Sequence, residues 1–173
     1  MSAGCQPARR GRPILGGMNE TSRFRVVPLP ADLARAVRET RRDAAGHPVL
    51  EVRDGGRHQC RACLTLSRED EAVLLLSHTP FASVQPYAET GPVYIHSRPC
   101  APEGAEGAWP AEFPRNLVVL RAYSPGDELV GAELVGERRV EDVARDVLAR
   151  PEVAYLHARN ADLGCYMFRM EPA

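Results

Sequence analysis

Alternating and continuous apolar runs along the chain predict a series of short β-strands. In a half-buried strand every second side chain points to the core, and a strand buried on both faces is apolar throughout. Residues 72–76 (AVLLL) are continuously apolar, and the other runs alternate approximately between apolar and polar residues. The predicted strands are residues 24–28, 47–53, 60–66, 72–76, 92–97, 117–123, 129–135, 153–158 and 165–170.

Two segments show the helical period instead. After Asp32, which would serve as an N-cap, apolar residues recur at positions 33, 36 and 37, with arginines 35, 38, 41 and 42 on the outer side. Positions 140, 143, 144, 147 and 148 form a full apolar stripe, and Pro151 ends that helix. Turn sequences at residues 124–127 and 160–164 join neighbouring strands into hairpins. The order predicts an α+β fold, a single compact domain with a mostly antiparallel sheet and two to three helices.

The ends of the chain and its loops set the domain boundary. Residues 1–21 lack a core pattern, so we expect a disordered N-terminal tail or a misplaced start, with Met18 as the alternative first residue, and residues 22–173 as the domain. Residues 99–114 hold four prolines and two glycines and predict a long surface loop. A third functional hypothesis, a structural or partner-binding domain without catalysis, predicts an exposed apolar patch around this loop and Trp109.

Composition and charge narrow the class of protein. The 173 residues carry 22 basic and 23 acidic side chains, and every basic residue except histidine is arginine, which excludes Schiff-base chemistry at lysine. Residues 1–17 contain Arg9, Arg10 and Arg12 and no acid, so the rest of the chain is mildly acidic. We expect no nucleic-acid partner and no membrane association. Without a recognisable signal peptide the expected location is cytoplasmic, while the oligomeric state and whether the protein is an enzyme stay open.

The five cysteines, at positions 5, 60, 63, 100 and 165, provide one candidate chemistry. The Cys60-x-x-Cys63 spacing is typical of zinc sites and of thiol-redox pairs, and Cys100 and Cys165, or His96 and His157, would complete a zinc set. Against this, a strand over 60–66 would point Cys63 away from Cys60. We therefore expect no cofactor, with zinc at Cys60, Cys63, Cys100 and Cys165 as the alternative.

Alternation along the predicted strands gives a second candidate chemistry. If the strands are neighbours, one sheet face gathers arginine, histidine and tyrosine side chains, which suit a small anionic ligand because arginine grips carboxylate or phosphate and histidine moves a proton. The residues expected to bind such a ligand are Arg61, His96, Arg121, His157, Arg159 and Asn160. The competing interpretation is a solvated face, and Asn160 also suits a hairpin turn.

Three stretches carry a resemblance to a known family. They are residues 60–64 (CRACL), residues 86–96 (PYAETGPVYIH) followed by Cys100, and residues 157–161 (HARNA) followed by residues 164–166 (GCY). In this order and spacing the chain, over about residues 22–172, resembles the bacterial domain-of-unknown-function family numbered 1203. The resemblance implies no activity, because none is assigned to the family.

Overall fold

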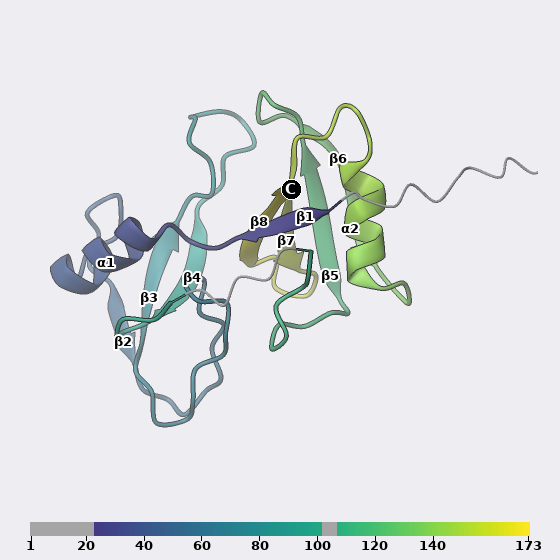
Figure 1. Ribbon diagram of the computed structural model, residues 1–173. Helices are drawn as coiled ribbons and strands as arrows, with labels where there is room; N and C mark the ends of the chain where they lie inside the picture. The colour runs from purple at the N-terminus through teal and green to yellow at the C-terminus, as the bar shows by residue number, and fades with distance from the viewer. Residues whose placement is uncertain (1–22, 102–106) are drawn as a thin grey trace, which may run out of the picture.

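The computed structural model describes residues 23–101 and 107–173, so the predicted tail over residues 1–21 lies outside the described residues. Within those ranges the chain forms two helices and eight strands in two antiparallel sheets (Figure 1), which confirms the α+β prediction. The elements are β1 (Phe24–Val27), α1 (Ala31–Thr40), β2 (Leu50–Val52), β3 (Val73–His78), β4 (Gly91–His96), β5 (Val118–Tyr123), β6 (Leu129–Val135), α2 (Val140–Leu148), β7 (Tyr155–Asn160) and β8 (Tyr166–Pro172).

The larger sheet has the strand order β1-β8-β7-β5-β6. The predicted hairpins β5–β6 and β7–β8 supply four of its strands, and β5 also pairs with β7, which places Arg121 opposite His157. Helix α2 lies against this sheet, with its stripe of valines, Ala144 and Leu148 buried. Trp109 and Phe113 close the same core, and the Trp109 ring meets the Phe168 ring edge-on at 4.7 Å between centroids. The expected exposed patch around Trp109 is therefore wrong, since Trp109 is only 2% exposed.

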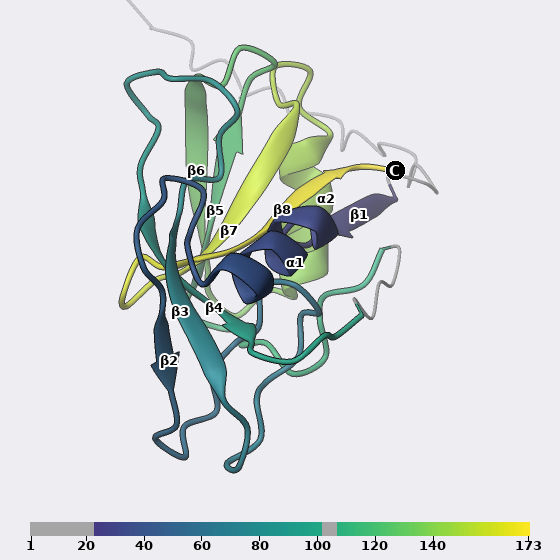
Figure 2. The same ribbon diagram turned by 90° about the vertical axis from the view of Figure 1, so that its left-hand side faces the viewer.

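The smaller sheet has the order β2-β3-β4 and packs with α1 around a second core (Figure 2). Helix α1 begins two residues earlier than expected, at Ala31, with Pro30 rather than Asp32 at its N-cap. The buried residues of β3 and β4 face Ala34 and Val37 of the helix, together with the segment around Cys60. Sequence reasoning placed β3 and β4 within one or two residues but did not anticipate that they form a separate sheet.

The two sheets meet where β4 contacts β8. Tyr166 of β8 belongs to the core of the smaller sheet, and the buried Arg61 side chain donates from Nε to the Tyr166 carbonyl at 2.9 Å. The chain itself crosses between the sheets directly after β1, where the Leu29 amide donates to the Arg61 carbonyl at 2.8 Å. The segment around residues 60–64 therefore lies at the junction of both sheets. Neither α1 nor α2 is long and apolar enough to cross a membrane.

Candidate metal centre

Residues 60–64 form a tight turn where the alternating pattern predicted a strand. The Cys60 amide donates to the Thr65 carbonyl at 2.9 Å, and the Leu64 amide donates back to the Cys60 carbonyl at 2.9 Å. Leu64 itself has a left-handed backbone, with φ at 64°. Because the chain reverses here, both cysteine side chains reach the same site. The expectation that Cys63 would point away from Cys60 is therefore wrong.

Strand β4 and the residues after it bring two more candidate ligands to this turn. His96 is the last residue of β4, and Cys100 follows it after a short segment containing Pro99. The Arg61 amide donates to the Tyr94 carbonyl at 2.9 Å and so fixes the turn against β4. The His96 amide donates to the Cys60 sulfur at 3.3 Å. The two segments, some thirty-five residues apart along the chain, are thus held together by one backbone hydrogen bond and one bond from a backbone amide to a cysteine sulfur.

The four candidate ligand atoms form a compact cluster. One ligand atom each from Cys60, Cys63, His96 and Cys100 lies within 4.8 Å of all the others. The Cys60 and Cys100 sulfurs are 3.8 Å apart, and the Cys63 sulfur lies 3.4 Å from His96 Nδ1. Around a tetrahedral zinc ion, with sulfur at about 2.3 Å and nitrogen at about 2.0 Å, neighbouring ligand atoms are roughly 3.5–3.8 Å apart. These two separations therefore match a tetrahedral zinc site.

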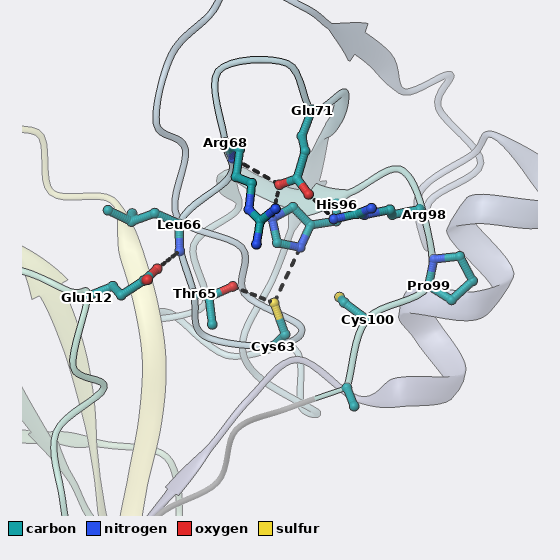
Figure 3. A pocket seen from close by; sticks show the side chains of 11 residues that line it. Cys63, Thr65, Leu66, Arg68, Glu71, His96, Arg98, Pro99, Cys100 and Glu112 are labelled. Atoms are coloured by element: carbon teal, nitrogen blue, oxygen red, sulfur yellow. Dashed lines mark hydrogen bonds and ion pairs between the residues drawn. The ribbon is translucent and has the colours of Figure 1, made fainter.

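Two charged side chains support the cluster from outside. Figure 3 shows the His96 ring between the Cys63 sulfur and the Glu71 carboxylate, with Nε2 at 3.5 Å from Glu71 Oε2. A metal-bound histidine commonly has a carboxylate against its second ring nitrogen, which fixes the ring and raises its basicity. On the other side, Arg38 Nη2 donates to the Cys100 sulfur at 3.1 Å, and Arg38 Nε donates to the His96 carbonyl at 3.0 Å.

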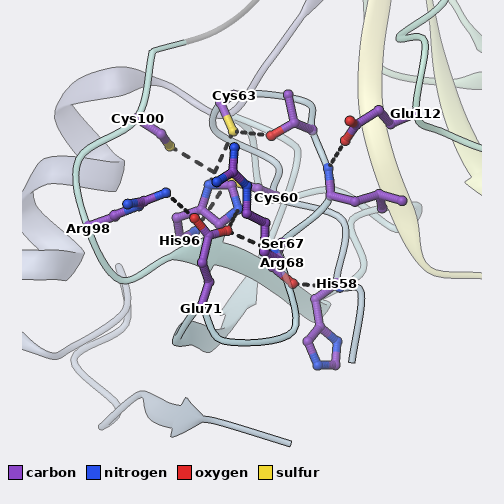
Figure 4. Close-up of polar contacts among 12 residues, drawn as sticks. His58, Cys60, Cys63, Ser67, Arg68, Glu71, His96, Arg98, Cys100 and Glu112 are labelled. Atoms are coloured by element: carbon purple, nitrogen blue, oxygen red, sulfur yellow. Dashed lines mark hydrogen bonds and ion pairs between the residues drawn. The ribbon is translucent and has the colours of Figure 1, made fainter. Parts of the chain in front are cut away.

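The thiols of the cluster have perturbed acidities. A hydrogen bond from Cys100, and after it one from Cys63, lowers the pKa of Cys60. A hydrogen bond between Cys100 and Cys63 lowers the pKa of Cys63. Cys100 donates to both of these sulfurs and is therefore harder to ionise, so its pKa is raised. Figure 4 shows the polar contacts that join these sulfurs to their neighbours. The cluster thus favours thiolate at Cys60, and thiolate is the form that binds metal ions.

A pocket of about 420 Å³ opens over the cluster. Cys63, His96 and Cys100 contribute to its wall, and the charged side chains around them belong to Arg68, Glu71, Arg98 and Glu112. Glu71 is anchored by an ion pair with Arg98 and by the Arg68 amide, which donates to it at 2.9 Å. Cys60, Cys63 and His96 are buried and Cys100 is half-buried, so the cluster borders the pocket from which an ion would enter.

Two residues proposed for the same metal set lie elsewhere. Cys165 is in the β7–β8 turn, half-buried, where its sulfur lies 3.9 Å from the Leu163 carbonyl. His157 is in the middle of β7, fully buried, and its ring contacts Phe81, Tyr123, Tyr155 and Tyr166 with centroids 4.8–5.2 Å away. Cys165 therefore lies outside the cluster, in which His96 accompanies Cys60, Cys63 and Cys100.

The residues predicted to bind an anion are divided between three places. Arg61 is buried and donates to the carbonyls of Tyr166 and Gln59, while His96 lies in the cysteine cluster. Arg121 and Arg159 both pair with the Glu89 carboxylate, the latter at 2.9 Å, on the sheet face that also holds His157.

Asn160 ends β7, and its backbone closes the turn to β8. Its amide donates to the Cys165 carbonyl at 3.0 Å, and its carbonyl accepts from Gly164 at 2.9 Å. The left-handed position of this turn is Gly164, with φ at 70°. Asn160 is therefore the last residue of the strand before the turn, and the turn conformation expected of it is adopted by Gly164 instead.

Sequence reasoning missed both outer residues of the cluster. Arg38 was expected on the outer side of its helix, and Glu71 was not among the candidate site residues. In the structure Arg38 reaches Cys100, and the Glu71 side chain is only 12% exposed. No local signal marks either residue, because each acts through a partner at least 25 positions away in the sequence.

Comparison with known proteins adds a family and no activity. The family model described as a protein of unknown function, DUF1203, matches residues 57–171, which include all four residues of the cluster. No curated protein and no solved structure matches the chain. The match covers well over half of the sequence and agrees with the resemblance of the three motif stretches. The chain therefore belongs to the DUF1203 family of proteins of unknown function.

Proposed function

We propose that this protein binds one zinc ion through Cys60, Cys63, His96 and Cys100. The observation that carries the proposal is the mutual separation of the four ligand atoms, none more than 4.8 Å from another. Four potential ligands converge here from a turn, a strand end and a loop. Such convergence costs conformational entropy and leaves three thiols at one place, and a metal ion would offset both costs.

The donor set favours zinc over other common ions. Three sulfurs and one imidazole are soft to borderline ligands, which suit zinc and exclude calcium and magnesium, since those ions prefer oxygen. Three thiolates and Zn²⁺ together carry a charge of about −1. The guanidinium of Arg38 touches Cys100, and the buried Arg61 lies close enough to Cys60 to interact with its charge. These arginines would stabilise the negative centre in its buried position.

Four protein ligands complete a tetrahedral site and leave no position for a substrate, so the proposed zinc is structural. It would join the 60–64 turn, the end of β4 and the start of the segment from Pro99 to Pro114. That segment carries Trp109 and Phe113 into the core of the larger sheet. The ion would therefore stabilise the junction of the two sheets.

A thiol-redox role is the second candidate, favoured by the 3.8 Å between the Cys60 and Cys100 sulfurs. Oxidation would join these sulfurs and release two protons and two electrons to an acceptor such as oxidised glutathione. The anionic-ligand hypothesis in its original form is less well supported, because Arg61 and His96 lie away from the face that holds Arg121 and His157.

Metal analysis of the purified full chain tests the proposal. We expect about one zinc per chain, and a Co²⁺-substituted protein with the sulfur-to-cobalt absorption and intense visible bands of a tetrahedral thiolate site. Cys63→Ser should lose most of the metal, whereas the matched control Cys165→Ser should keep it, because Cys165 is outside the cluster. Fewer than roughly 0.1 zinc per chain, in protein purified without chelator, would exclude the zinc function. A Cys60–Cys100 disulfide formed reversibly by oxidised glutathione would then support the redox role.

A further inference from the structure

A second cavity, of about 220 Å³, lies between the two sheets and away from the cysteine cluster. One wall comes from the smaller sheet, with His78 at the end of β3 and Gly91 and Pro92 at the start of β4. The opposite wall comes from the β7–β8 hairpin, with Arg159, residues 163–165 and Tyr166. Pro80 and Glu89, from the loop between β3 and β4, complete the lining. This cavity shares no lining residue with the pocket over the cluster.

Arg159 provides the only arginine side chain of this lining, and it is 5% exposed. Its Nη1 donates to the Gly164 carbonyl at 3.0 Å, which fixes the guanidinium in place. Its Nε and Nη2 atoms are buried and make no hydrogen bond to any described residue. Nη2 lies 2.9 Å from Glu89 Oε1 as an ion pair without hydrogen-bond alignment. The Nε and Nη2 side of arginine is the edge that binds a carboxylate through two parallel hydrogen bonds, and Glu89 covers this edge without completing those bonds.

Guanidinium groups outnumber carboxylates near this cavity. Glu89 is shared between Arg159 and Arg121, so a single carboxylate faces two guanidinium groups. Arg61, which lies close enough to His78 of the lining to lower its pKa, is buried and bonded only to carbonyl groups of the described residues. Buried cations without matching anions are costly, and a bound anion would relieve that cost.

Size and lining identify the chemical class of the anion. The volume is below the roughly 300–1,000 Å³ of sites for drug-sized ligands, which leaves room for a small molecule only. Pro80, Pro92, Leu163 and the Tyr166 ring offer apolar surface beside the guanidinium. A carboxylate has the planar pair of oxygens that fits this edge of arginine, and a short carbon chain would fit the apolar part.

We propose that the cavity between β3 and the β7–β8 hairpin binds a small organic acid through its carboxylate, with Arg159 as the binding residue. Glu89, on an exposed loop, competes with the ligand for the same guanidinium. The ligand carboxylate takes the aligned positions on Nε and Nη2, and Glu89 moves toward Arg121. This site is independent of the proposed zinc ion, because it uses none of the four metal ligands.

Titration of the full chain with propionate tests the proposal, followed by the Arg159 Nε–Hε signal in NMR spectra and by calorimetry. Wild-type protein should show saturable binding with a shift of that signal. Glu89→Gln should bind propionate at least about fivefold more tightly, because the competing carboxylate is gone. Arg159→Gln should weaken binding at least about tenfold, while Arg150→Gln, a matched control at an exposed ion pair with Glu133, should not change it.

Three outcomes would overturn the proposal. The first is that propionamide, a neutral molecule of the same shape, binds as well as propionate. The second is that inorganic phosphate binds more tightly than propionate, which would assign the site to phosphate. The third is that Glu89→Gln fails to tighten binding. The Glu89 side chain is 44% exposed, so this variant should fold and can be measured even if Arg159→Gln does not fold. Zinc content, measured on the same samples, separates this result from the fate of the metal centre.

Discussion

Replacement of His157 by phenylalanine should remove a large part of the acid sensitivity of the fold. The His157 side chain is fully buried, and neither ring nitrogen has a hydrogen-bond partner among the described residues. Burial, and after it the nearby positive charge of Arg159 and Arg169, lowers the pKa of His157 from 6.5 to about 3. Asp127 acts in the opposite direction, and His78, itself neutral near pH 7 because burial lowers its pKa to about 4, adds a smaller effect.

The sign and size of the effect follow from this difference. The unfolded chain takes up a proton at His157 below about pH 6.5, whereas the folded chain does not until about pH 3. The native state therefore loses stability as the pH falls through this range. The loss amounts to about 2 kcal/mol between pH 7 and pH 5 and approaches about 5 kcal/mol below pH 3. Above pH 6.5 the group makes almost no contribution to the pH dependence.

Urea denaturation at pH 7 and at pH 5, followed by far-ultraviolet circular dichroism and by the fluorescence of Trp109, measures this difference. Phenylalanine suits the aromatic surroundings of Phe81, Tyr123 and Tyr155 and has no nitrogen to desolvate. We expect the variant to be at least as stable as wild type at pH 7, and its advantage to increase by about 2 kcal/mol at pH 5. His47→Phe is the control, because the His47 side chain is 70% exposed. An equal loss of stability in wild type and His157→Phe between the two pH values would refute the reasoning.

Two further predictions concern the metal centre and the larger core. Glu71→Gln should weaken zinc binding about 10- to 100-fold without abolishing it, because Glu71 faces His96 rather than the ion. Competition with a chromophoric chelator measures the zinc affinity. An unchanged affinity would show that the Glu71–His96 contact has no effect on zinc binding. Trp109→Ala should lower the free energy of unfolding by about 3–5 kcal/mol, since the ring is buried against Phe168. The control Val84→Ala, at a fully exposed position of the β3–β4 loop, should change it by less than about 0.5 kcal/mol. Urea denaturation measures both, and similar losses in the two variants would contradict the buried position of Trp109.

The sequence by itself determined most of the secondary structure. The hairpins β5–β6 and β7–β8, helix α2 and the buried run in β3 follow from periodicity and turn residues, and these signals are local. The division into two sheets could not be predicted, because it depends on pairings between strands far apart in the chain, such as β1 with β8. The turn at residues 60–64 was misread for a related reason. Its alternation is that of a strand, but the hydrogen bonds from Cys60 to Thr65 and from Leu64 to Cys60 reverse the chain.

The candidate sites show the same division between local and tertiary information. Cys60 and Cys63 were recognisable from their spacing, and Cys100 and His96 as nearby candidates, but the choice of His96 over Cys165 needed the position of β4 beside the turn. Arg38 and Glu71 had no local signal at all. Likewise, the alternation in β5 and β7 placed Arg121, His157 and Arg159 on one face, yet only the tertiary structure shows that His157 is enclosed by aromatic rings while Arg159 keeps two donors free of hydrogen bonds to the described residues. The geometry of a ligand site depends on contacts between residues far apart in the chain. Side-chain periodicity indicates which face of a strand or helix a residue occupies, but not which residue lies opposite it. A single sequence therefore predicts such contacts only poorly.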